Sequence, residues 1–210
     1  MEASASAPTA AHIEPEPSDW QPRALWLSAR LLCGAVAFFF MAFLFAYFYL
    51  RSLNTNHAWR IGEVNPSEGL GVMIMATLLL SAVIFRLTSR RPADMLAGGI
   101  IALILATIAL VLQVVEWTTL GFGPSSGGYA SVFIGWTVFY AVFILFGLYW
   151  METQVASLWR ARRTGIDRPV REGVPAAEVD LLQAGIEAAS FYWAFFVAIG
   201  VLAYIVLYLV

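Results

Sequence analysis

The sequence alternates long apolar stretches with short segments that hold most of the charge. Five stretches are predominantly apolar: residues 26–50, 70–87, 95–117, 129–150 and 187–210. A helix needs roughly 20 apolar residues to cross the hydrocarbon core of a bilayer. The segments between these stretches contain arginine, glycine and proline, and irregular backbone of this kind cannot face lipid without unpaired polar groups. The pattern therefore predicts an all-α integral membrane protein, a bundle of five transmembrane helices.

Composition supports this prediction. Hydrophobic residues make up 60% of the 210 residues, charged residues make up 12%, and the mean hydropathy is +0.76. Soluble domains contain about 25% charged residues. Residues 26–210 are predicted to form one membrane domain. Residues 1–25 are rich in Ala, Ser, Pro and Glu, so we expect a disordered tail or a strap over a partner.

The charge distribution predicts the orientation of the chain. All twelve basic residues are arginines, and ten of them precede the first span, open it, or lie in the connections between spans two and three and spans four and five. Only Arg51 and Arg60 fall on the other side. The positive-inside rule then places the N-terminus in the cytoplasm and the C-terminus outside.

The longest predicted connection, the cytoplasmic linker 154–182, is amphipathic at its start. Arg160, Arg162 and Arg163 lie close to apolar positions, among them Trp159. Such a segment is typical of a helix at the membrane interface whose arginines face anionic lipid. The alternative is a specific contact with another protein. Membrane phospholipids and neighbouring subunits are the expected partners, and no nucleic acid is expected.

The main candidate for a functional polar site lies at the end of the third span. Glu116 follows a long apolar run, and Gln113 precedes it by three residues on the same helical face. An unpaired charge in hydrocarbon costs several kcal/mol, so Glu116 needs a partner. Two interpretations remain open: a Glu at an interfacial helix end, or a buried polar structural pair that ties the 118–128 loop to the third helix. Glu152 and Glu187 border spans on the water-accessible side and are weaker candidates.

The sequence offers no recognisable catalytic, cofactor-binding or metal-binding residues. Neither His12 nor His57 lies in an apolar span, and Cys33 is the single cysteine. Haem and copper usually take imidazole or sulfur ligands. Phosphate-loop, dinucleotide-binding and nucleophile-elbow motifs are also lacking. Small residues at four-residue spacing instead predict close helix packing, at Ala42 and Ala46, at Ala102 and Ala106, and at Gly185 and Ala189.

Four motifs resemble those of one family. Residues 39–49 are rich in aromatic side chains, and residues 112–117 read Leu-Gln-Val-Val-Glu-Trp. The run 129–133 is followed by Thr137, and Glu187 precedes the Tyr192-Trp193-x-Phe195 element. In this order the motifs resemble those of subunit III of haem-copper oxygen reductases (cytochrome c oxidases), in its five-helix bacterial form. Trp117, Tyr192 and Trp193 are therefore candidate helix or lipid contacts, as are the three arginines 160, 162 and 163.

The resemblance implies a function for the chain. Subunit III binds no redox centre, packs on the catalytic subunit I and holds structural lipids while the complex reduces oxygen to water. Haem and copper would lie in the partner subunits, and the location would be the bacterial cytoplasmic (inner) membrane. The chain departs from the family pattern where Tyr140 and Phe143 replace two histidines, where Ala194 and Val197 replace His and Asp, and where Val36 replaces a glutamate. The alternatives are a similar accessory protein of a nitric oxide reductase and, from another class, a small membrane transporter.

Overall fold

The structure is a computed structural model that describes residues 20–54, 59–60, 65–91, 93–164 and 176–210. These residues form five helices, and the last of them continues into one π-helical turn: α1 (Trp20–Ser52), α2 (Glu68–Thr88), α3 (Met95–Thr119), α4 (Gly128–Thr164), α5 (Ala176–Tyr204) and η1 (Ile205–Leu209). All five helices are long and apolar enough to cross a membrane. The predicted fold class, a five-helix multi-pass membrane protein, is confirmed.

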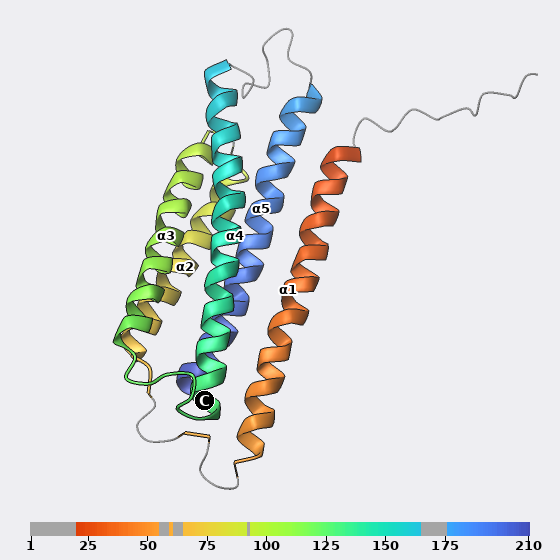
Figure 1. Ribbon diagram of the computed structural model, residues 1–210. Helices are drawn as coiled ribbons and strands as arrows, with labels where there is room; N and C mark the ends of the chain where they lie inside the picture. The colour runs from red at the N-terminus through yellow and green to blue at the C-terminus, as the bar shows by residue number, and fades with distance from the viewer. Residues whose placement is uncertain (1–19, 55–58, 61–64, 92, 165–175) are drawn as a thin grey trace, which may run out of the picture.

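Successive helices run in opposite directions, and the helices lie side by side along their length (Figure 1). The pairs that pack against each other are α1 with α5, α5 with α2, α2 with α3, α3 with α4, and α4 with α1. The five helices therefore close a ring. A further contact between α4 and α5 crosses this ring, which places α5 against three neighbours.

Three helices extend well beyond the predicted spans. The first begins at Trp20 rather than near residue 26, α4 continues to Thr164, and α5 begins at Ala176 rather than near residue 187. The amphipathic start of the predicted 154–182 linker is thus the last part of α4 and is not a separate element (Figure 1). Hydropathy marks only the part of a helix that suits hydrocarbon, whereas backbone hydrogen bonding continues through polar residues into water.

An aromatic cluster fills the space between α1, α4 and α5. Phe40 of α1 is only 2% exposed and packs against Trp136, Tyr140 and Phe143 of α4 and Phe196 of α5. The rings of Tyr140 and Phe196 stack with centroids 4.4 Å apart. Tyr140 therefore belongs to the packed core, and the partly buried Phe143 packs against it.

The three predicted small-residue pairs do not all lie at helix contacts. Ala102 and Ala106 are completely buried, and Ser81 of α2 donates a hydrogen bond to the carbonyl oxygen of Ala102 at 2.8 Å. Gly185 and Ala189 are also buried, and a Cβ atom at Gly185 would lie 2.6 Å from the side-chain oxygen of Gln154. Ala42, in contrast, is exposed on α1. Two of the three pairs thus lie at internal helix contacts.

Candidate functional site

A buried polar cluster lies in the last turns of α3. Glu116 is 0% exposed and Gln113 is 4% exposed. The Gln113 side-chain amide donates a hydrogen bond to Oε2 of Glu116 at 2.8 Å. Because residues three apart lie on the same helical face, the spacing alone brings these two side chains together.

The second donor to Glu116 comes from the far end of the described chain. The Tyr208 hydroxyl donates to Oε1 of Glu116 at 2.5 Å, and Tyr208 lies in the η1 turn. The Tyr208 ring packs edge-on against Phe133 of α4 and stacks on Tyr204. Glu116 therefore joins α3 to the end of the last helix, and its described side-chain partners do not include the 118–128 loop.

A glycine on α2 makes room for this tyrosine. A Cβ atom at Gly71 would lie 2.6 Å from Cε1 of Tyr208, which is closer than side chains pack. Glycine at this position therefore lets the α2 backbone approach the Tyr208 ring. The cluster thus depends on α2 as well as on α3 and η1.

Further hydrogen bonds fix the same end of the bundle. The indole nitrogen of Trp117 donates to the hydroxyl of Thr137 on α4 at 3.0 Å. The Tyr129 hydroxyl donates to the carbonyl oxygen of Leu207 at 2.5 Å. Arg51, at the end of α1, donates to the carbonyl oxygen of Val210 at 3.1 Å. Hydrogen bonds from α1 and α4 thus reach the last residues of the chain, and a further hydrogen bond joins α3 to α4.

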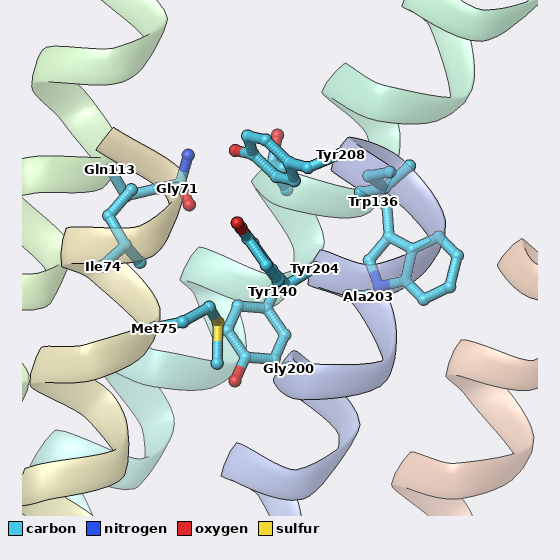
Figure 2. Close-up of a pocket in the computed structure, with 12 residues that line it drawn as sticks. Gly71, Ile74, Met75, Gln113, Trp136, Tyr140, Gly200, Ala203, Tyr204 and Tyr208 are labelled. Atoms are coloured by element: carbon cyan, nitrogen blue, oxygen red, sulfur yellow. The ribbon is translucent and has the colours of Figure 1, made fainter. Parts of the chain in front are cut away.

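A small cavity of about 30 Å³ lies beside the cluster. It is lined by residues of α2, α3, α4, α5 and η1, and Figure 2 shows Gln113, Tyr204 and Tyr208 turned toward one another around it. A cavity needs roughly 10–15 Å³ of such space to hold one water molecule. The site therefore has room for a water molecule.

A second chain of hydrogen bonds crosses the middle of the bundle. The Trp193 indole nitrogen of α5 donates to the Ser81 hydroxyl of α2 at 3.1 Å, and Ser81 donates to Ala102 of α3. Tyr192 is buried beside Trp193, and within the described part of the chain its hydroxyl has no hydrogen-bond partner. The two residues are therefore internal helix contacts and do not face lipid.

The three arginines of the sequence prediction lie apart from this cluster, near the end of α4. Arg160 is exposed, and Arg163 lies over the Trp159 ring at 5.2 Å. Arg162 donates to the carbonyl oxygen of Ala93 at 2.9 Å and so links α4 to the turn between α2 and α3. Arg90 and Arg91 precede the same turn. We call this the arginine-rich end.

Sequence reasoning found Gln113 and Glu116 but missed Tyr208, Ser81 and Gly71. Ser81 had a usable signal, because it is a hydroxyl in an otherwise apolar part of α2. Tyr208 had none, since tyrosines near span ends usually mark membrane interfaces. Among the described residues, no three His, Cys, Asp or Glu side chains gather closely enough to hold a metal ion. His12 and His57 lie outside the described residues.

Comparison with known proteins identifies no family. No protein-family model matches the chain, and no curated protein is similar enough to be matched.

Proposed function

We propose that this chain is a non-catalytic accessory subunit, of the subunit III type, in a respiratory haem-copper oxidase. In this role it packs on the catalytic subunit and holds structural lipids while the complex reduces oxygen to water. The haem and copper belong to the partner subunits, in line with a sequence in which neither histidine lies in an apolar span. What the chain supplies is a rigid, helical surface.

The observation that carries the proposal is a contact between two of the family-like motifs. Trp117 ends the Leu-Gln-x-x-Glu-aromatic motif, and its indole donates to Thr137 of the next motif. A second pair of motifs meets where Phe40 of the aromatic run packs against Phe196, next to the Tyr-Trp-x-Phe element. Motifs that were recognised separately along the sequence therefore support one another in space.

The test is purification of the full-length chain from its native membrane in a mild detergent. We expect a large haem- and copper-containing subunit to co-purify, with oxygen consumption by the isolated complex. After separation, the chain alone should show no haem absorbance and no stoichiometric metal. A haem spectrum from the isolated chain would overturn the proposal.

The identity of the partner separates the alternatives. A co-purifying large subunit with non-haem iron and nitric oxide reduction, instead of copper and oxygen reduction, would favour the nitric oxide reductase version. If no haem protein is retained under any mild condition, and the reconstituted chain moves a solute across vesicles, the transporter alternative replaces the proposal.

A further inference from the structure

Three side chains that line the cavity beside the Glu116 cluster each carry a polar atom without a hydrogen-bond partner among the described residues. These atoms are the Tyr204 hydroxyl, the side-chain carbonyl oxygen of Gln113 and the indole nitrogen of Trp136. Gln113 is 4% exposed and Trp136 is 0% exposed, so bulk water does not reach them. Buried polar groups in native proteins nearly always pair, either with protein or with ordered water. The cavity therefore contains hydrogen-bonding groups that the protein alone does not satisfy.

The other polar side chains around the cavity are already paired. The hydroxyls of Tyr208, Thr137 and Tyr140 each donate a hydrogen bond to a carboxylate or carbonyl oxygen of the protein. The three unpaired atoms are an acceptor on α3, a donor on α4 and, at the end of α5, a hydroxyl that can do either. Because they belong to three different helices, a ligand placed between them would join those helices.

The chemistry of these atoms requires a small ligand that both donates and accepts hydrogen bonds. Water does both, and the cavity of about 30 Å³ exceeds the roughly 10–15 Å³ that one water molecule needs. A cation fits less well, because the Glu116 carboxylate does not line the cavity and both of its oxygens already accept hydrogen bonds from the protein. An empty cavity also fits less well, since cavities that stay dry are lined by apolar groups.

We propose that the cavity holds an ordered water molecule, which accepts a hydrogen bond from the Tyr204 hydroxyl and donates one to the side-chain carbonyl oxygen of Gln113. Figure 2 shows these two side chains turned toward each other from α5 and α3. The Trp136 indole is a further donor for water in this cavity. Because Gln113 also donates to Glu116, the water joins Tyr204 to the Glu116 cluster. Water bound in this way belongs to the chain itself, whichever complex the chain joins.

The first test is X-ray radiolytic footprinting of the purified full-length chain in lipid nanodiscs. Hydroxyl radicals form from water, so a side chain inside the membrane is oxidised fast only where ordered water lies beside it. Met75 lines the cavity, whereas Met151 does not and is 1% exposed. Met41 is 52% exposed on the apolar surface of α1 and is the control for lipid-facing methionines. We expect Met75 to be oxidised several-fold faster than either control.

The second test is a double-mutant cycle on the two proposed water ligands, which share no direct hydrogen bond. Tyr204→Phe should lower the midpoint of thermal unfolding in detergent by about 2–4 °C, since the water loses a partner. In a Gln113→Leu background the same change should have far less effect, because the bridge is already broken. Tyr140→Phe is the matched control: the Tyr140 hydroxyl lines the same cavity but donates to the carbonyl oxygen of Phe196 at 3.3 Å. Its effect should be equal in both backgrounds.

Equal effects of Tyr204→Phe in the two backgrounds would overturn the proposal, and so would oxidation of Met75 no faster than that of Met151. If Gln113→Leu fails to fold, the footprint decides, because Tyr204→Phe should slow the oxidation of Met75 toward the rate of Met151. An unfolding midpoint that rises with sodium concentration at constant ionic strength, and does so only while Gln113 is present, would also overturn the proposal and would assign the cavity to a cation.

Discussion

Glu116 is the residue whose environment differs most from what its chemistry favours, because it is a carboxyl group with no exposed surface in a membrane helix. Its two side-chain oxygens each accept one hydrogen bond, from Gln113 and from Tyr208. The cost of burying such a group is reduced only while these donors stay in place. The stability of this end of the bundle therefore depends on the two donors and on the space that they need.

Tyr208→Phe should lower the free energy of unfolding by about 1–2 kcal/mol. The ring stays in place, but one buried oxygen of Glu116 loses its donor. Unfolding in mixed detergent micelles measures the change. Tyr149→Phe is the control, since Tyr149 is 67% exposed and should change stability by less than about 0.5 kcal/mol. Equal stability of the two variants would contradict the assigned hydrogen bond.

Gly71→Ala should destabilise the protein by about 1–3 kcal/mol, because the new methyl group would overlap the Tyr208 ring. Gly69→Ala, two residues earlier on the exposed side of α2, meets only an ordinary contact and should be neutral or slightly stabilising. Thermal unfolding of both variants in detergent tests this. A Gly71→Ala variant as stable as Gly69→Ala would show that Tyr208 packs elsewhere.

At the scale of helices, contacts between elements rest on single hydroxyl groups. The Ser81 hydroxyl both accepts from Trp193 of α5 and donates to α3. Helices in lipid gain no hydrophobic energy by meeting, so such hydrogen bonds and close packing hold them together. The stability of the region where α2, α3 and α5 meet therefore depends on the Ser81 side chain.

Ser81→Ala should lower the free energy of unfolding by about 1 kcal/mol, because the Trp193 indole loses its acceptor inside the bundle. Ser157→Ala is the matched control, since the Ser157 hydroxyl donates only within its own helix, to the carbonyl oxygen of Thr153. Chemical unfolding followed by tryptophan fluorescence measures both. If the control loses as much stability as Ser81→Ala, the bond between helices is not what stabilises this region.

Hydropathy predicted all five helices, but it did not predict which faces pack. In a soluble protein an apolar position is usually buried, whereas in a bilayer both buried and lipid-facing positions are apolar. Phe38 and Phe40 show the difficulty, since they are two residues apart and are 83% and 2% exposed. Gln113 and Glu116 were identifiable because polar side chains are rare in spans. Their partner Tyr208 was not, because only the tertiary fold brings it near.

At the scale of the whole molecule, the two ends of the bundle differ in charge and in the contacts that they contain. The arginine-rich end includes Arg90, Arg91 and the arginines at the end of α4. The opposite end holds the Glu116 cluster and the contacts of η1. Orientation in the membrane is a property of this whole arrangement, because it depends on how charge is divided between the two ends.

The positive-inside rule predicts that the arginine-rich end is cytoplasmic. Single cysteines placed at exposed positions, Ser125→Cys and Thr164→Cys, test this in a Cys33→Ala background. In intact cells, a membrane-impermeant maleimide should label the first variant and should label the second only after permeabilisation. The reverse pattern would invert the topology.

Under the proposed accessory role, Glu116→Ala should reduce retention of the catalytic subunit several-fold on detergent purification. Loss of the carboxyl group loosens the end of the bundle where α3, α4 and η1 meet. Glu152→Ala should retain the partner as the wild type does, because Glu152 is an exposed residue of α4. If both variants retain the catalytic subunit equally, the Glu116 cluster does not contribute to assembly of the complex.

The hydrogen bond between Glu116 and Tyr208 can form only late in synthesis of the chain. Tyr208 is translated 92 residues after Glu116, which takes roughly 5–20 s at ordinary ribosome speed. During that interval the third span is already made, and Gln113 is the only side chain of the cluster available to its carboxyl group. Insertion of the final span therefore completes the assembly, and a nascent chain arrested before Tyr208 would expose an unfinished membrane helix to quality control.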